Sequence, residues 1–267
     1  MVVYTPGAAK MFGGEKGIKA RINVVVSRSN KAFSDSGIKA SLNLVHAGQV
    51  NYASGGKMSD DLMNISFRKT SLKKQVAELR KQYKADLVTL VTGKASGRVA
   101  GMGFLLNRKS PAPRLGFNVV GGRALYYTVL AHECGHNLGC QHATNDFDGS
   151  IKGVFTNSHG LRFNTTFAGR SYPMRTIMAY GAGPRLGYYS NPNVQVWGAP
   201  TGITNSANNA YTISQTAPMV GSYMTEIIHT MKLGPNAQPS IKFLPGTATR
   251  PGLRQPRRTI RLNFYGD

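Results

Sequence analysis

One stretch of thirteen residues, AHECGHNLGCQHA at 131–143, restricts the possible folds of this chain more than any other part of its sequence. Three of the six histidines lie in it. If the stretch begins as a helix, His132 and His136 project from the same face one turn apart, so both imidazoles can reach one metal ion. Gly139 can end that helix sharply and let the chain return with His142 as a third ligand. The stretch therefore predicts a buried helix, a glycine turn and a three-histidine metal site.

Three protein ligands with an open fourth position are typical of a catalytic zinc, because a structural zinc is usually enclosed by four ligands. Glu133 lies beside the first histidine and is not needed to hold the ion. It can instead face the open position and take a proton from the water there. The alternative is a helix with surface histidines, which a lone His-x-x-x-His pair would often indicate. The full frame H-E-x-x-H-x-x-G-x-x-H specifies five residues in eleven positions and favours the zinc site.

The same stretch contains both cysteines of the chain, Cys134 and Cys140. Two cysteines are too few for a disulfide framework, and on a continuous helix this pair would lie on different faces. They form no Cys-x-x-Cys pattern and occupy no ligand position. We therefore expect two small, buried apolar side chains and no redox site.

The net charge of the chain is strongly positive: 33 Lys and Arg residues outnumber 11 Asp and Glu residues, which gives +22 at pH 7. Such a charge favours an anionic partner, whether a nucleic acid, an acidic protein or a membrane surface. The basic residues are scattered, however, and no zinc-finger, homeodomain or RNA-binding motif accompanies them, so nucleic acid is not the favoured target. Solubility, packaging with an acidic partner or delivery through an acidic channel would explain the charge equally well.

With 267 residues, the chain is long enough to bury one full hydrophobic core. No run of eighteen apolar residues predicts a transmembrane helix, and the start MVVYTPGAAKMF lacks the pattern of a secretory signal.

Apolar patterns in the first third of the chain predict strands that alternate with helices. The β-branched run 22–26 predicts a strand, followed by a helix that Gly37 closes. Leu42, Leu44 and His46 alternate as in a second strand. An amphipathic helix is expected at 72–83 after an N-cap at Ser71, and ADLVTLV directly after it predicts a strand buried on both faces. This alternation is typical of a twisted, mainly parallel sheet.

The pattern changes after Val91. Residues 92–122 are rich in Gly, Ser and Pro and predict loops around one short strand in GMGFLL at 101–106. Helices are expected at 123–139 and at about 212–231. The last stretch, 232–267, is basic and proline-rich without periodicity, which predicts an extended tail.

The histidine frame resembles that of the metzincin zinc endopeptidases, whose second mark is a methionine turn beneath the metal. The segment MRTIMAYG places Met178 thirty-six residues after His142, so Met178 resembles the Met-turn residue, with an ordinary core methionine as the alternative. Several segments resemble the reprolysin-like (adamalysin-like) branch, particularly its bacterial members, and together cover most of residues 2–224. These segments are VVYTPGAA, YKADLVTLV, GMGFLL, SHGLRF, RTIMAYG and YYSNPNVQVWGAPTG.

This resemblance implies an α/β (α+β) fold with a twisted mixed sheet, an active-site helix and a smaller irregular C-terminal subdomain. The expected division is 1–142 for the N-terminal subdomain, 143–231 for the C-terminal subdomain with the Met-turn and a helix, and 232–267 for the tail. The implied function is that of a zinc endopeptidase with one catalytic Zn²⁺, a protein or peptide substrate and a monomeric state. Secretion or delivery to another cell is favoured, and no motif supports a structural Ca²⁺.

The resemblance also implies how this site works. Glu133 would act as general base on the water and then pass the proton to the leaving amine. Metzincin substrates pair with an edge strand, here expected at the backbone of Gly103, Phe104 and Leu105, with an ordinary edge or hairpin strand as the alternative. Tyr180 stands two residues after the Met-turn methionine, as in the astacin and serralysin branches, where a tyrosine binds zinc at rest and swings to stabilise the oxyanion. The alternative is a packed, hydrogen-bonded core tyrosine.

One departure from the reprolysin pattern concerns the position after the third histidine. Ala143 stands where those enzymes usually have aspartate, and Asp146 is the nearest acid. We expect this to affect the subfamily more than the chemistry. The histidines outside the motif have no identifiable partner and are expected to be structural or surface residues: His46, His159 and His229.

Two other functions are compatible with the same sequence features. The chain could be a binding protein that keeps the zinc site and acts through its basic surface, or a delivered toxin whose charge aids packaging. Glu133 argues against the binding protein, because a site that only holds zinc does not need it.

Overall fold

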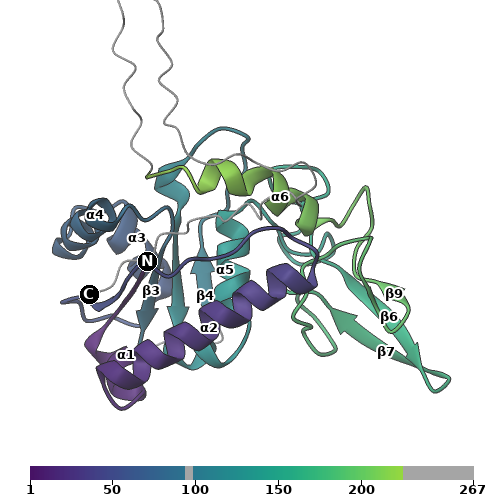
Figure 1. Cartoon of the computed structure of the whole chain (residues 1–267), viewed down its shortest axis with the longest axis horizontal. Helices are drawn as coiled ribbons and strands as arrows, with labels where there is room; N and C mark the ends of the chain where they lie inside the picture. The colour runs from purple at the N-terminus through teal and green to yellow at the C-terminus, as the bar shows by residue number, and fades with distance from the viewer. Residues whose placement is uncertain (94–98, 225–267) are drawn as a thin grey trace, which may run out of the picture.

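The fold is built on a five-stranded mixed sheet, seen in a computed structural model that describes residues 1–93 and 99–224 (Figure 1). The strand order is β2-β1-β3-β5-β4. The first four strands of this order are parallel, and β4 pairs antiparallel with β5 at the edge. The strands are β1 (Val2–Tyr4), β2 (Ala47–Gln49), β3 (Val88–Thr92), β4 (Gly101–Gly103) and β5 (Phe117–Gly121). The mixed α/β fold expected from the sequence is thereby confirmed.

Helices surround this sheet. Helix α5 contacts β4, β5 and the long helix α2, while α3 contacts β3, β4 and β5. Their bounds are α1 (Pro6–Met11), α2 (Glu15–Asp35), α3 (Met58–Ser66), α4 (Ser71–Tyr83), α5 (Val129–Asn137) and α6 (Asn209–Val220). Two 3₁₀ turns, at Pro113–Leu115 and Gly122–Tyr126, flank β5. All five residues of β3 and of β5 are buried, which places the centre of the core at these two strands.

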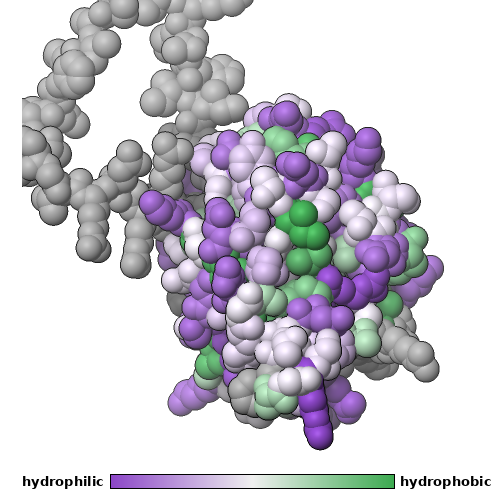
Figure 2. All heavy atoms as spheres, turned by 90° about the vertical axis from the view of Figure 1, so that its right-hand side faces the viewer, coloured by the Kyte–Doolittle hydropathy of each residue, from purple (hydrophilic) through white to green (hydrophobic). Residues whose placement is uncertain are grey.

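Beyond α5, the structure has short pieces and long loops. A hairpin of β6 (Arg162–Phe167) and β7 (Arg170–Arg175) is followed by the two-residue strands β8 (Gln195–Val196) and β9 (Ala199–Pro200). This part lies to the right of the sheet in Figure 1. Figure 2 turns that side toward the viewer: hydrophilic residues surround a small apolar group, so the described residues of this face form no broad apolar patch.

The strand predicted at 22–26 is wrong, because these residues lie inside α2. The buried positions of α2 recur every three or four residues, for example Ile18, Ile22 and Val25, which is the period of a helix with one face in the core. Val24, within the β-branched run, is 42% exposed. Burial of one helical face therefore outweighs the modest β-propensity of valine and isoleucine.

Other elements differ from the sequence-based expectations in their bounds. The second strand begins after the alternating residues, at Ala47, and β5 was not predicted, because it lies between glycine-rich segments that favoured loops. Helix α4 is capped by Thr70, whose hydroxyl accepts a hydrogen bond from the Lys73 amide at 3.0 Å, rather than by Ser71. The helix expected at 123–139 begins only at Val129, since a 3₁₀ turn precedes it.

Helix α6 covers the first part of the helix expected at 212–231, but it ends at Val220, and residues 221–224 form a turn. The rest of that prediction, the tail at 232–267 and His229 lie outside the described residues. Among the described helices, none combines the length and the apolar character that a bilayer crossing requires.

Candidate metal centre

Helix α5 carries the first part of the histidine motif. All nine of its residues are buried, so the helix passes through the interior. Gly139 follows with a φ of 89°, a left-handed conformation that glycine adopts without strain. A Cβ at this position would also lie 2.4 Å from Cγ2 of Val154. The helix and glycine turn expected from the sequence are both present, and they bring His142 back over α5.

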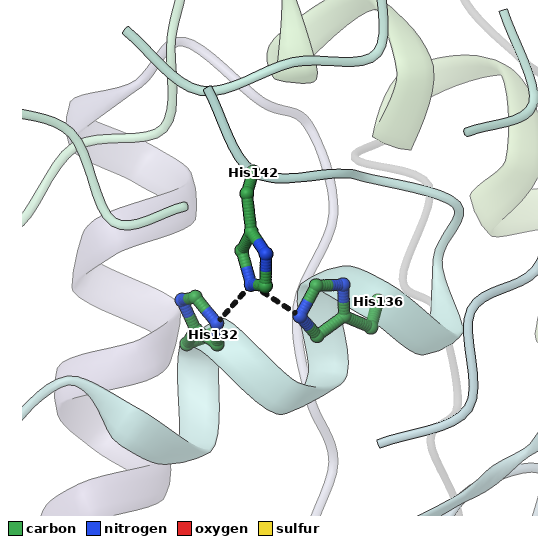
Figure 3. A group of neighbouring side chains, drawn as sticks. All are labelled: His132, His136 and His142. Carbon is green, nitrogen blue, oxygen red and sulfur yellow. Dashed lines mark hydrogen bonds between the residues drawn. The ribbon is translucent and has the colours of Figure 1, made fainter. Parts of the chain in front are cut away.

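The three histidines of the motif converge (Figure 3). The Nε2 atom of His142 lies 3.0 Å from Nε2 of His132 and 3.0 Å from Nε2 of His136. Among the described residues, the ligand nitrogens of these three histidines form a group able to hold a metal ion. The sequence predicted this grouping, and the structure brings it together.

Backbone carbonyls hold two of the rings in a single tautomer. Nδ1 of His132 donates to the Ile177 carbonyl at 2.9 Å, and Nδ1 of His136 donates to the Cys140 carbonyl at 2.9 Å. A carbonyl only accepts hydrogen bonds, so the proton of each neutral ring is on Nδ1 and the lone pair is on Nε2. Both Nε2 atoms are therefore ready to bind a cation.

The carboxylate of Asp148 orients the third ring, that of His142. Nδ1 of His142 lies 2.7 Å from Oδ1 and 2.9 Å from Oδ2 of Asp148. The role of Asp148 was not predicted from the sequence, because Asp146 is the acid nearest to the third histidine. The available signal was the acidic pair in ATNDFDGS directly after the third histidine.

The donor set fits a zinc ion. Three Nε2 lone pairs facing one another would repel unless a cation lay between them, and two nitrogen ligands of a tetrahedral zinc stand roughly 3.3–3.4 Å apart. The distances of 3.0 Å are close to that value. Burial lowers the pKa of His132 well below its usual range and that of His136 to about 3, so both rings stay neutral. Imidazole nitrogen also suits copper, iron and nickel, so the chemistry of the site is consistent with zinc without naming the ion.

Glu133 lies between α5 and the edge strand. It is 4% exposed, and burial raises the pKa of its carboxyl group to about 8. A Cβ on Gly101 would lie 2.4 Å from Oε1 of Glu133, and one on Gly103 would lie 3.3 Å from Oε2. The glycines of β4 thus make room for this carboxyl group. The sequence pointed to Gly103 for its backbone only and did not point to Gly101.

Successive residues at the β4 edge direct their backbone groups to opposite sides of the strand. Phe104, directly after the strand, donates its amide to the Phe117 carbonyl at 3.2 Å, and its carbonyl accepts from Nδ2 of Asn137 at 2.9 Å. Both backbone groups of Phe104 are therefore engaged inside the fold. Gly103 and Leu105 direct theirs to the other side, as alternate residues of an antiparallel ladder do. Of the three residues expected to meet a substrate, Phe104 thus has its backbone groups engaged within the fold.

Met178 is fully buried beneath the helix. A Cβ on Gly135 would lie 2.6 Å from the Met178 sulfur, so the thioether packs directly on the backbone of α5 between the two helical histidines. The preceding residue, Ile177, supplies the carbonyl that orients His132. This segment supports the site from below.

Tyr180 lies beside the histidines rather than in the core. Its ring centroid is 4.4 Å from that of His142 and 5.6 Å from that of His132, and the residue is 38% exposed. Partial burial and the nearby Glu133 raise the pKa of its hydroxyl to about 12, so the group keeps its proton. This placement differs from the alternative of a packed, hydrogen-bonded core tyrosine.

The remaining polar residues of the motif region are structural. The carboxylate of Asp146 is almost fully buried and accepts hydrogen bonds from the amides of Ala143 and Tyr180 and from Nη1 of Arg162. It ties the loop after the third histidine to the segment that carries Tyr180. Nδ1 of His159 donates to the His142 carbonyl at 2.8 Å, which is a structural contact.

Both cysteines are buried and free, as expected. Burial raises the pKa of Cys134 to about 12 and that of Cys140 well above its usual range. Neither thiol ionises near neutrality, which agrees with an apolar role.

Comparison with known proteins shows which family this arrangement resembles. Residues 19–143, which include the complete histidine motif, match the model of the reprolysin-like members of metallopeptidase family M12B. Residues 19–143 therefore resemble a reprolysin-like metallopeptidase domain.

Two curated relatives resemble the chain over a longer range than this match. The peptidyl-Asp metalloendopeptidase of Xanthomonas campestris pv. campestris is 28% identical over 229 residues, which is 84% of this chain and 51% of that protein. The protein of the same name from Stenotrophomonas maltophilia (strain R551-3) is 29% identical over 228 residues, which is 84% of this chain and 52% of that protein. The chain spans about half the length of these relatives.

A solved structure described as a chaperone-substrate complex shares the fold of the reprolysin-like chain. It superposes with a TM-score of 0.62 at 18% identity and covers 84% of this chain and 38% of the other. At this identity the likeness concerns the fold alone.

Proposed function

We propose that this chain is a zinc-dependent endopeptidase that hydrolyses peptide bonds in protein substrates. The observation that carries the proposal is the convergence of three Nε2 lone pairs beside Glu133, a buried glutamate that is not part of the metal-binding group. His132, His136 and His142 would hold the ion. When bound, zinc would supply Lewis acidity, which polarises the carbonyl and lowers the pKa of water.

Glu133 is the proposed general base and acid. Burial raises its pKa to about 8 without an ion, and the positive charge of bound zinc would favour the ionised form that accepts a proton. We expect it to take a proton from the attacking water and to pass that proton to the leaving amine. The charge of Glu133 raises the pKa of both Tyr180 and Arg185, which supports a position of its carboxyl group on the same side of the site as these two residues.

Three other elements complete the proposed active site. The protonated hydroxyl of Tyr180 would donate to the oxyanion that forms at the substrate carbonyl. The outward backbone groups of Gly103 and Leu105 would pair with the extended substrate as an added strand. Met178 would serve as the Met-turn residue, an apolar floor that packs under the site without binding the ion.

We further propose that the cleft lies between an N-terminal subdomain, 1–142, and a C-terminal subdomain that starts at residue 143. The irregular segments after α5 support this division, because they supply Tyr180 and Asp148 to a site otherwise built by the sheet and α5. The protein is expected to act as a monomer.

The relatives named peptidyl-Asp metalloendopeptidase suggest the substrate class. We extend to this chain a preference for cleavage next to aspartate. An acidic substrate also agrees with the net charge of +22, which would attract anionic chains.

Digestion of unstructured casein tests the proposal. Wild-type protein should cut it, and a zinc chelator should abolish the cleavage. Glu133→Ala should lower the rate by roughly 10²–10⁴-fold while its zinc content stays unchanged, since Glu133 is not a ligand. Glu78→Ala, at an exposed site on α4, is the matched control and should keep full activity. Intact wild type that binds zinc but cuts no protein would contradict the proposal.

The comparisons do not favour the rival in which the basic surface alone is functional. That rival predicts retention on heparin or DNA at physiological salt together with an unaltered biological effect of Glu133→Ala. Weak, salt-sensitive retention with loss of effect in Glu133→Ala is what the peptidase predicts.

A further inference from the structure

Three arginines lie near the segment that carries Tyr180, and two of them have hydrogen-bond partners in the fold. Nη1 of Arg162 binds Oδ1 of Asp146 at 2.9 Å. Arg175 donates through Nε to the Gly183 carbonyl at 2.9 Å and through Nη1 to the Ala179 carbonyl at 3.1 Å. These two guanidinium groups hold the loops around the candidate metal centre.

The third arginine, Arg185, has no such partner. In the described part of the chain its guanidinium group forms no hydrogen bond or ion pair, and its Nε is buried without an acceptor. Glu133 and Asp146 raise the pKa of Arg185 only from a distance, while burial and the nearby Arg175 lower it. A desolvated cationic donor without an acceptor costs free energy, so a reason for its position is required.

Arg185 lies beside the metal centre. Its guanidinium carbon is 5.7 Å from the centroid of the Tyr180 ring, and that ring in turn contacts His142. The charge of Arg185 lowers the pKa of both His132 and Glu133. The group therefore lies near the tyrosine ring that flanks the three histidines.

The backbone holds Arg185 in this position. The Arg175 amide donates to the Pro184 carbonyl at 3.2 Å, and the Leu186 amide donates to the Arg175 carbonyl at 2.8 Å. These two bonds form a short parallel bridge around Arg185. The backbone from which the Arg185 side chain extends is thus held in place beside the site.

We infer that Arg185 binds a carboxylate of the substrate and is the residue that selects an aspartate next to the scissile bond. The inference rests on the proposed peptidase function and names the group that reads its substrate. A guanidinium group stays charged at all relevant pH values and matches a carboxylate in two parallel hydrogen bonds. An acidic side chain in an extended substrate would accept hydrogen bonds from the guanidinium group, which has no acceptor among the described residues.

A peptide series tests this role. The peptides differ only at the residue next to the cut, which is Asp, Asn, Leu or Lys, and each is made with a free and with an amidated C-terminus. The proteins are wild type, Arg185→Gln, Arg185→Lys and Arg185→Glu. Arg170→Gln, which removes an exposed charge on β7, is the matched control. Zinc content and melting temperature are measured for every variant, so that loss of folding is recognised.

Wild type should prefer Asp over Asn by roughly 10- to 100-fold in kcat/KM. Arg185→Gln should lose this preference and keep the rate on the Asn and Leu peptides. Arg185→Lys should retain part of it, because a single ammonium lacks the fork, and Arg185→Glu should favour the Lys peptide. An Asp-to-Asn ratio that is the same in wild type and Arg185→Gln would overturn the inference. So would a rate that falls on amidation, since Arg185 would then bind the chain end of the peptide.

A binding measurement separates this inference from the peptidase proposal. Titration of the Asp and Asn peptides into zinc-loaded Glu133→Ala does not depend on cleavage. Tighter binding of the Asp peptide, lost in Glu133→Ala/Arg185→Gln, supports the role of Arg185 even if wild type cuts no peptide. Equal binding of both peptides contradicts it even if wild type is an active peptidase.

Discussion

The carboxylate of Asp148 accepts a hydrogen bond from Nδ1 of His142 at 2.7 Å, and Asp148 lies six residues after the histidine that it orients. The other two rings of the site donate to backbone carbonyls. His142 is therefore the one ring of the three whose orientation depends on a side chain that mutation can remove. A charged acceptor also makes the ring a stronger donor to a metal.

We expect Asp148→Ala to weaken zinc binding by roughly 10- to 100-fold, with Asp148→Asn in between, because the ring loses its charged acceptor. Competition with a chelator of known affinity measures the effect. Asp60→Asn, at an exposed ion pair with Arg68, is the control and should bind zinc as wild type does. Unchanged affinity of Asp148→Ala would show that the loop alone orients His142.

Gly101 should be intolerant of a side chain. A Cβ there would lie 2.4 Å from Oε1 of Glu133 and 2.7 Å from Cγ1 of Val129, so the carboxyl group must move. We expect Gly101→Ala to lower kcat at least about 10-fold and the free energy of unfolding by about 1–3 kcal/mol, with zinc content retained. At Gly55 an added Cβ meets nothing within 4 Å, and Gly55→Ala should keep full activity. Equal kcat values for the two variants would refute the role given to Gly101.

Removal of the Tyr180 hydroxyl should affect the chemical step and not the fold. The ring is partly exposed beside His142, so Tyr180→Phe keeps its packing. If the hydroxyl stabilises the oxyanion, kcat should fall by roughly 10- to 100-fold with little change in KM or in the melting temperature. Steady-state kinetics with Tyr211→Phe, at an exposed tyrosine of α6, as control decide this. Full kcat in Tyr180→Phe would leave the tyrosine without a catalytic role.

His46 should make the fold sensitive to acid. Burial lowers its pKa from 6.5 to about 2, and its ring packs against Tyr83 with centroids 4.8 Å apart. Below about pH 6.5 the unfolded chain binds a proton at this residue and the folded chain does not, so the free energy of unfolding falls as the pH is lowered. Denaturant unfolding of chelator-treated protein at several values between about pH 7 and pH 5 should show a shallower fall for His46→Gln than for wild type. Parallel curves for the two proteins would contradict this expectation.

Local patterns in the sequence accounted for the elements whose reasons are local. The spacing of His132 and His136 needs only one helical turn, and Gly139 needs only its freedom to adopt a positive φ. The buried strand β3 was recognisable because five consecutive residues lie inside the sheet. The strand predicted at 22–26 failed for the opposite reason, since the face that α2 buries depends on what packs against it.

The sequence by itself determined the ligand set of the site, because three histidines and a glutamate at fixed spacing can meet only one way on a helix and its following turn. The tertiary structure decided everything that joins distant segments: that Gly101 faces Glu133, that Met178 packs under Gly135, and that Arg185 lies beside Tyr180 with no acceptor for its Nε among the described residues. The physical reason is the range of the forces. Hydrogen bonding and backbone geometry within a turn act between neighbours in the chain, whereas close packing and desolvation depend on which segments the whole fold brings together.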